Sequence, residues 1–139
     1  MRLVVDTNIL ISALFTDTSL PAHLIVLWRE GRFDLLTSAT QLDELTRVTR
    51  YPKIRERLAP ALAGRFINEL RDVAVMVKNV PAVTFCSDPD DNYLLAVAAA
   101  GAADFLVTGD KRHLLTIKLY ERTRIITVRD FLVLHRRLP

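Results

Sequence analysis

Two short apolar runs in the sequence each lead into an aspartate. The run 3–5 is followed at once by Asp6, and the run 105–107 is followed by Thr108 and, after a glycine, by Asp110. Apolar runs without polar alternation are typical of strands buried on both faces of a parallel sheet. Ligands of open α/β sheets bind at the carboxyl ends of such strands. Both aspartates are therefore candidates for a site at one sheet edge, and the alternative for each is a helix N-cap.

Two further acids belong to predicted helices. Glu44 lies at the border of the apolar stripe of a helix expected over 38–50, where an isolated glutamate is most often solvated but can also face the sheet edge. Asp91 lies in the first turn of a helix expected over 89–100, with Asp88 as its N-cap. Capping and the helix dipole explain this acidic start by themselves. A carboxylate on the first turn is nevertheless well placed to hold a cation.

Four converging carboxylates favour a divalent metal ion, because a hard cation relieves their mutual repulsion. Mg²⁺ binds one or two carboxylates directly and completes its shell with water and phosphate oxygens, so four acids are enough for one or two ions. No Cys/His cluster indicates zinc. The three histidines are scattered, and each is expected at the surface rather than in a site: His23, His113 and His135.

Bulk composition suggests one domain over residues 1–139, since half of the 139 residues are hydrophobic and can form a sizeable core. Nineteen Lys and Arg against sixteen Asp and Glu give a net charge of +3, a mild basic excess compatible with a polyanionic partner. A single cysteine, Cys86, excludes an internal disulfide, and no signal peptide precedes the first strand, so we expect a cytoplasmic location. No apolar run approaches the ~18 residues of a membrane span.

The remaining pattern predicts an alternation of strands and helices. Further strands are expected over 33–37, 73–77 and 124–127, and further helices over 9–15, 20–30, 53–72 (broken near Pro60), 111–115 (a helical turn) and 128–137. Such alternation indicates an α/β protein with three layers, α/β/α, and a mainly parallel central sheet.

Four stretches resemble, in order and spacing, the PIN-domain nucleases, and together they extend over nearly the whole chain: 4–9, 41–45, 88–95 and 104–111. The most specific part is the Asp88 stretch joined to the segment 106–110. The sequence looks most like the bacterial and archaeal branch described as toxins of toxin–antitoxin systems, similar to VapC-type toxins.

The resemblance implies the roles of individual residues. The matching acids of the family bind Mg²⁺ or Mn²⁺ around a scissile phosphodiester: Asp6, Glu44, Asp91 and Asp110. Supporting residues match Thr7, Asn8, Thr108 and Asp88. Asp90 adjoins Asp91, and we choose Asp91 because its offset to Ala96 and Ala98 fits the small-residue helix face of the family. Arg112 and His113 lengthen the turn after Asp110.

We therefore expect a metal-dependent endoribonuclease that leaves 5′-phosphate and 3′-hydroxyl ends. The basic residues Arg47, Arg50 and Lys53 are candidates for gripping RNA, and a solvated helix face is their alternative. The resemblance also implies an antitoxin partner and a homodimer. Leu20 and the apolar residues at 24, 25, 27 and 28 are a hint that part of this helix forms a dimer face, and the alternative is that all of them lie in the core.

Other functions compete with this one. The chain could be a catalytically inactive PIN-like module that binds RNA or a partner, or a nuclease of RNA processing unrelated to an antitoxin. A phosphatase of the haloacid dehalogenase type needs a second aspartate where Asn8 stands. A phospho-acceptor receiver domain is disfavoured because Lys111 follows Asp110 too closely.

Overall fold

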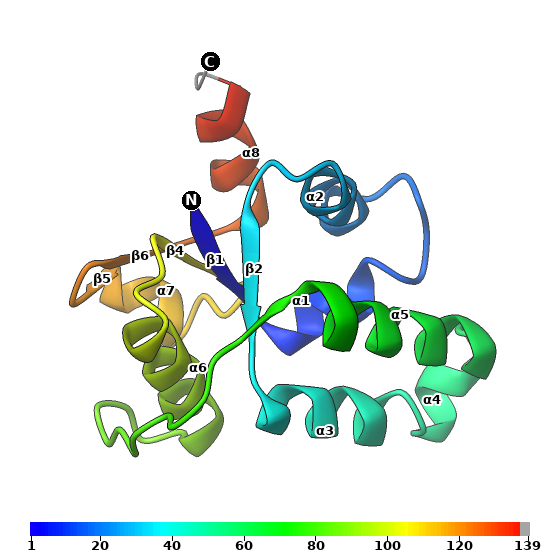
Figure 1. The fold of residues 1–139 in the computed structure, drawn as a ribbon, viewed down its shortest axis with the longest axis horizontal. Helices are drawn as coiled ribbons and strands as arrows, with labels where there is room; N and C mark the ends of the chain where they lie inside the picture. The colour runs from blue at the N-terminus through cyan, green and yellow to red at the C-terminus, as the bar shows by residue number, and fades with distance from the viewer. Residues whose placement is uncertain (137–139) are drawn as a thin grey trace.

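A six-stranded sheet lies between two layers of helices in the computed structural model, which describes residues 1–136 (Figure 1). The order across the sheet is β3-β2-β1-β4-β6-β5. β5 pairs antiparallel with β6, and the other pairings are parallel. The strands are β1 (Arg2–Val5), β2 (Asp34–Thr37), β3 (Val75–Met76), β4 (Phe105–Val107), β5 (Leu119–Tyr120) and β6 (Thr123–Ile126).

Eight helices connect these strands within the described residues. They are α1 (Thr7–Ser12), α2 (Leu20–Arg29), α3 (Ala39–Val48), α4 (Pro52–Arg55), α5 (Pro60–Val73), α6 (Pro89–Ala100), α7 (Leu114–Ile117) and α8 (Val128–Arg136). Ser19, Ser38 and Asp88 cap α2, α3 and α6 through side-chain oxygens that accept backbone N–H groups. These caps satisfy donors that the first helical turn leaves free.

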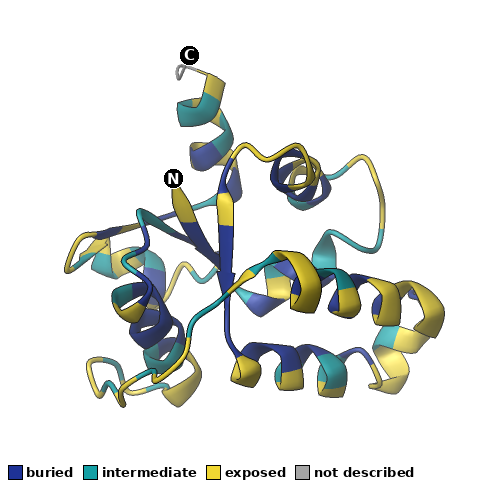
Figure 2. Ribbon diagram, in the orientation of Figure 1, coloured by how far each residue is buried: buried dark blue, intermediate teal, exposed yellow. Residues whose placement is uncertain are grey.

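The side chains of β1 alternate between two cores. Leu3 and Val5 pack with α1, α2, α3, α5 and α8, whereas Val4 packs with α6 and α7 on the other face. The sheet is accordingly buried from both sides, and the exposed residues lie on the outer faces of the helices, in the loops and at the starts of strands (Figure 2). The expected three-layer α/β/α fold with a mainly parallel sheet is confirmed.

Several element boundaries differ from the prediction. The first helix begins at Thr7, because Asp6 caps it, and it ends at Ser12. The strand expected over 73–77 is reduced to β3, since α5 continues to Val73. The short β5 was not predicted, because its two residues carry no alternation that a sequence pattern could reveal. The helical turn expected over 111–115 starts only at Leu114.

Other boundaries agree. The charged stretch 53–72 divides into α4 and α5, and Pro60 occupies the first turn of α5 as expected from its missing N–H. The end of α8 was predicted at 137, which lies outside the described residues. None of the helices within residues 1–136 is long and apolar enough to cross a membrane.

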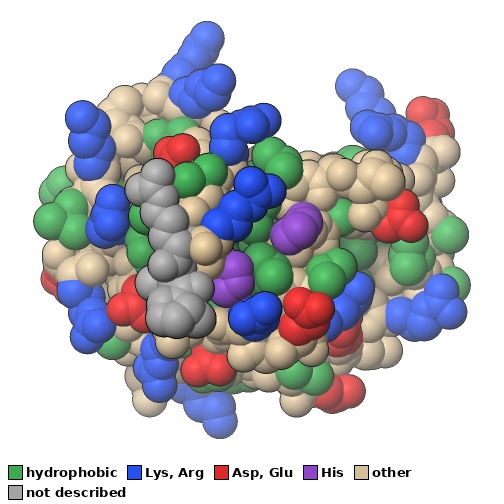
Figure 3. All heavy atoms as spheres, turned by 90° about the horizontal axis from the view of Figure 1, so that it is seen from above, with side chains coloured by type: hydrophobic (Ala, Val, Ile, Leu, Met, Phe, Trp, Pro, Cys, Tyr) green, Lys and Arg blue, Asp and Glu red, His purple; other side chains and the backbone are tan. Residues whose placement is uncertain are grey.

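Most of the apolar face of α2 does not form a free dimer surface. Leu24, Ile25, Leu27 and Trp28 are all buried in the core of this chain. The core alternative therefore holds for these four residues, whereas Leu20 at the start of α2 is exposed. Seen from above, toward α2 and α8, the molecule presents basic, acidic and hydrophobic side chains interspersed with one another (Figure 3).

Candidate metal centre at the carboxyl edge of the sheet

A cavity of about 580 Å³ lies where the parallel strands β1 and β4 end. Carboxylates from four parts of the chain line it: Asp6, Glu44, Asp88, Asp90, Asp91 and Asp110. Arg47 is the one basic residue among the described residues that line this cavity. The fold thus brings the four acids singled out from the sequence into one acidic cavity, together with two acids of the α6 start.

Asp6 is fixed at the end of β1 by its neighbours. Its Oδ2 accepts a hydrogen bond of 2.7 Å from the Thr108 hydroxyl at the end of β4, and its Oδ1 accepts one of 3.3 Å from the backbone N–H of Asn8. Burial raises the pKa of Asp6 above its ordinary value, although both hydrogen bonds oppose this rise. Repulsion from Asp110 and Asp90 adds to it. Asp6 is thus both an N-cap and a member of the acidic cavity.

Asp110 organises the turn that follows β4. Its Oδ1 accepts hydrogen bonds from the backbone N–H groups of Arg112 and His113, both at 3.2 Å, and its Oδ2 accepts one from Leu114 at 3.4 Å. Burial opposes ionisation of this carboxyl, but the backbone hydrogen bonds outweigh burial and lower its pKa. The same contacts explain why helix α7 starts at Leu114 rather than at 111, since the turn wraps the carboxylate first.

Asp91 is the most buried of these acids, with a relative exposure of 6%. Its Oδ2 has no hydrogen-bond partner among the described residues. Burial, followed by repulsion from Asp110 and Asp88, raises the pKa of Asp91 to about 6. An unpartnered buried carboxylate oxygen is costly, so Asp91 is the group in this cavity that most needs a cation. The neighbouring Asp90 is exposed, although it also lines the cavity.

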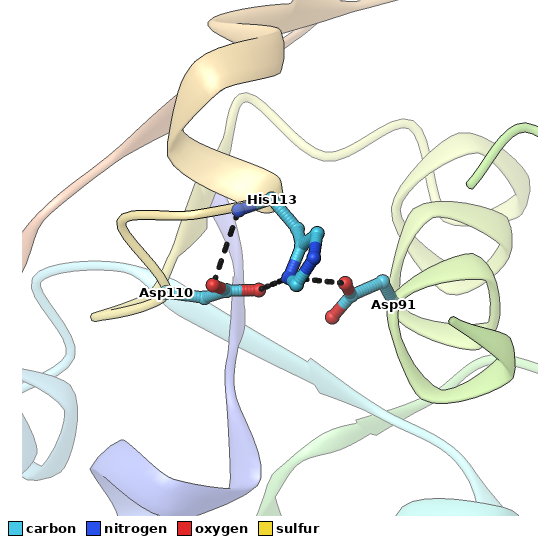
Figure 4. A group of neighbouring side chains, drawn as sticks. All are labelled: Asp91, Asp110 and His113. Atoms are coloured by element: carbon cyan, nitrogen blue, oxygen red, sulfur yellow. Dashed lines mark hydrogen bonds and ion pairs between the residues drawn. The ribbon is translucent and has the colours of Figure 1, made fainter. Parts of the chain in front are cut away.

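His113 projects over the two aspartates, as Figure 4 shows. Its Nδ1 lies 3.5 Å from Asp110 Oδ2 and 4.0 Å from Asp91 Oδ2. One ligand atom from each of these three residues lies within 4.8 Å of the others. His113 is exposed, as expected from the sequence, but its imidazole also lies beside these two carboxylates. The turn held by Asp110 brings it back to the site, although its side chain is half exposed.

Helix α3 delivers Glu44 and Arg47 to the cavity, and a buried glutamine anchors this helix. Gln41 is 1% exposed. Its Nε2 donates to the carbonyl of Val5 at 2.8 Å and to the Thr7 hydroxyl at 3.3 Å, and its Oε1 accepts from the Thr37 hydroxyl at 2.7 Å. Gln41 therefore ties α3 to the ends of β1 and β2. This role is not apparent from the sequence, because a glutamine next to an apolar stripe is usually a surface residue.

The remaining predicted residues take different positions. Asn8 lines the cavity, as do Thr7 and Asp88, and Thr108 is fully buried beneath it. Tyr93 also lines the cavity and was not anticipated. Its hydroxyl lies 3.1 Å from the Ser38 hydroxyl, which joins α6 to the start of α3, and burial raises its pKa.

The donor set of this cavity fits a hard divalent cation. Carboxylate oxygens are the ligands that Mg²⁺ and Mn²⁺ prefer, and the unpartnered Asp91 oxygen faces the others. A bound ion would also offset the repulsion that raises the pKa values of Asp6 and Asp91. The residues present thus fit such an ion on charge, on donor type and on the missing hydrogen bond.

Comparison with known proteins identifies the family. The family model for the PIN domain matches residues 2–112. The chain belongs to the PIN domain family. A similar protein is the one from Methanocaldococcus jannaschii described as "Uncharacterized protein MJ1680", which is 30% identical over 112 residues, covering 80% of this chain and 72% of that protein. No solved structure matches the chain.

PIN domains have a nuclease fold and are typically metal-dependent nucleases, so membership agrees with the acidic cavity. The match contains the four predicted acids and ends at residue 112. His113 lies just outside it.

Proposed function

We propose that this PIN domain is a metal-dependent endoribonuclease that hydrolyses RNA phosphodiester bonds and serves as the toxin of a type II toxin–antitoxin system. The observation that carries the nuclease proposal is the buried, unpartnered Oδ2 of Asp91 in a cavity lined by Asp6, Glu44 and Asp110. The toxin role is supported by the resemblance of the sequence to VapC-type toxins.

The residues of the cavity have different proposed roles. Asp6, Glu44, Asp91 and Asp110 would hold Mg²⁺ or Mn²⁺. When bound, the ion supplies charge neutralisation at the phosphate and activation of an attacking water. Thr108 keeps the Asp6 carboxylate oriented by its hydrogen bond, and Thr7 and Asn8 begin the helix that Asp6 caps. Asp88 fixes the first turn of α6, from which Asp91 projects.

The proposed RNA contacts lie along α3 and α4. Arg47 lines the acidic cavity and is placed to contact a phosphate near the scissile one. Arg50, in the turn after α3, lines a second cavity of about 380 Å³ between α3, α4 and α5, together with Arg55 and Arg71, and none of the described residues that line it is acidic. Lys53 is exposed on α4, close in sequence to Arg50 and Arg55. Phosphates of a bound strand would interact with these cations.

Cleavage assays with a site variant test the nuclease proposal. We expect the wild type to cleave single-stranded RNA in Mg²⁺ or Mn²⁺ but not in EDTA, and Asp6→Asn to lose cleavage by at least a hundredfold, because it removes one anionic ligand while keeping the shape. Asp17→Asn removes the same charge from an exposed position outside the cavity and should cleave like the wild type. A DNA strand of the same sequence tests the choice of RNA.

Two results would end this proposal. Cleavage by Asp6→Asn at the wild-type rate would show that the activity does not use the acidic cavity. RNA binding without cleavage by the wild type, in Mg²⁺ and in Mn²⁺, would favour the inactive binding module instead.

The toxin role adds a partner to the proposal. An antitoxin peptide laid across the cavity could place an arginine among the carboxylates, pair with them bidentately and exclude the metal. We expect production of the protein to arrest cell growth, Asp6→Asn to abolish the arrest, and the product of a neighbouring gene to relieve it. Growth arrest that persists with a tightly bound partner would contradict inhibition. A nuclease that causes no arrest would favour RNA processing instead.

The homodimer remains part of this proposal mainly on the family resemblance, because four of the five apolar residues of α2 that suggested it are buried and Leu20 is exposed. Light scattering at tens of micromolar tests it directly. A molar mass of one chain would exclude the dimer and leave the nuclease proposal intact.

A further inference from the structure

His113 stands out because the turn after β4 directs its imidazole toward the acids. Its backbone N–H donates a hydrogen bond of 3.2 Å to Asp110 Oδ1. The next residue, Leu114, is fully buried and packs α7 against the sheet. The imidazole is therefore attached to a fixed turn rather than to a free surface loop. Its Nδ1 points between Asp110 and Asp91 (Figure 4).

We infer that His113 supplies a nitrogen ligand, through Nδ1, to the metal ion that Asp91 and Asp110 hold. This inference rests on the proposed function and deepens it, since it changes the ligand set from oxygen alone to mixed nitrogen and oxygen. The observation beside the cluster itself is Asp91 Oδ2, an oxygen of a 94% buried residue that has no hydrogen-bond partner among the described residues and lies 4.0 Å from this nitrogen.

The distances between the three groups fit a shared ion. Two ligand atoms on one ion of this size, each at about 2.1 Å, lie roughly 3 Å apart in adjacent positions and about 4.2 Å apart in opposite positions. The separations of Nδ1 from the two carboxylate oxygens are 3.5 and 4.0 Å, between these limits. Asp110 Oδ2 accepts one long backbone hydrogen bond and keeps lone-pair capacity for an ion.

A nitrogen ligand has a consequence for the choice of metal. Mg²⁺ is bound almost entirely through oxygen, whereas imidazole is a good ligand for first-row transition metals. The site should therefore bind Mn²⁺ more tightly than an all-carboxylate site would, with less gain for Mg²⁺. The alternative is that the imidazole only pairs with the carboxylates and moves away when the ion binds.

Pulsed electron paramagnetic resonance of the Mn²⁺-loaded, tag-free full chain distinguishes the two. We expect ¹⁴N modulation from a coordinated imidazole in the wild type and its loss in His113→Ala and His113→Gln. His23→Ala, which removes an exposed histidine of α2, should keep the signal. Titration should show Mn²⁺ affinity lowered about tenfold or more by His113→Ala, with a smaller loss for Mg²⁺. Circular dichroism checks that each variant is folded.

The ¹⁴N signal decides whether His113 is a ligand, and cleavage is used only to separate this inference from the proposed function. Wild-type protein that binds Mn²⁺ and cleaves RNA but shows no ¹⁴N modulation overturns the nitrogen ligand and leaves the proposed function standing. A signal that persists in His113→Ala comes from another nitrogen and also overturns it. Wild-type protein that binds no Mn²⁺ overturns both the ligand and the metal-dependent nuclease.

Discussion

The Thr108 hydroxyl donates a 2.7 Å hydrogen bond to Oδ2 of Asp6 and so joins the ends of two adjacent parallel strands. The same Oγ1 accepts the backbone N–H of Asp110 at 3.1 Å. One fully buried hydroxyl thereby fixes the positions of two carboxylates that are 104 residues apart in the sequence. The residue acts through these acids rather than on a substrate.

Replacing Thr108 by valine should therefore impair the site more than the fold. We expect a loss of about 1–2 kcal/mol of unfolding free energy, because a buried hydrogen bond to a carboxylate disappears. The pKa of Asp6, already raised by burial, should rise further without this donor, so the acidic limb of kcat/KM against pH should move to higher pH. Thr108→Ser keeps the hydroxyl and should leave the limb in place. An unmoved limb in the valine variant would contradict the role given to this bond.

The raised pKa of Asp91 should make the metal-free protein less stable as the pH rises toward neutrality. Its carboxyl has a pKa of about 6 in the folded protein against an ordinary value of 3.8. Between these values the folded state binds more protons than the unfolded state, so the contribution of Asp91 to stability is fully present below about pH 4 and is lost as the pH rises through 6. Without metal, Asp91→Asn should therefore stabilise the protein at pH 7 by about 3 kcal/mol, since one pKa unit corresponds to about 1.4 kcal/mol.

Urea unfolding in EDTA at pH 4 and pH 7 measures this effect. Most of the stability gain of Asp91→Asn should be lost at pH 4, where the wild-type carboxyl is protonated in the folded state and about half protonated in the unfolded state. Added Mn²⁺ should stabilise the wild type and leave the variant unchanged, because the variant lacks the ligand. An Asp91→Asn variant that is less stable than the wild type at pH 7 would show that this carboxylate stabilises the apo fold.

Gln41 is predicted to position the helix that carries Glu44. Gln41→Leu leaves the carbonyl of Val5 and the hydroxyl of Thr37 without their buried partner, which should cost about 2–4 kcal/mol. Because α3 loses its link to the end of β1, the Mg²⁺ concentration for half-maximal cleavage should rise several-fold at a temperature where the variant is folded. Thr46→Ala removes a hydrogen bond confined to α3 and should leave the metal dependence unchanged. A destabilised Gln41→Leu with normal metal dependence would make Gln41 a purely structural residue.

Much of the fold follows from local signals, and the exceptions have physical causes. Asp6 and Asp110 could be placed at one sheet edge because each follows a buried strand, and parallel strands end together. His113 could not be placed there, since its position depends on a turn that the Asp110 carboxylate shapes. Gln41 is hidden for a related reason: a pattern shows which residues are apolar, not which polar groups find buried partners.

Gly101 shows that packing between distant segments is also hard to predict from the sequence. A glycine is a common residue at the end of a helix, and Gly101 follows α6 directly. The structure adds that a Cβ at this position would lie 2.6 Å from Leu36 Cδ1 and 3.0 Å from Val77 Cγ2. The glycine is therefore also required by the close packing of α6 against the sheet, and packing between distant segments leaves no trace in the local sequence.

The arginines of the second cavity are expected to contribute to RNA binding rather than to cleavage. Arg50 comes from the turn after α3 and Arg71 from α5, and both line this cavity, with no acidic residue among the described residues that line it. Each phosphate contact contributes about −0.7 to the slope of log K against log salt concentration for a single strand. The double variant Arg50→Ala/Arg71→Ala should therefore bind RNA more weakly and with a slope less steep by about 1.4.

Fluorescence anisotropy in EDTA, where the RNA stays intact, measures both the affinity and the slope. The double variant Arg32→Ala/Arg136→Ala removes the same charge from residues that line neither cavity. If the two double variants change the slope equally, the effect reflects net charge, and the second cavity is not part of the RNA path.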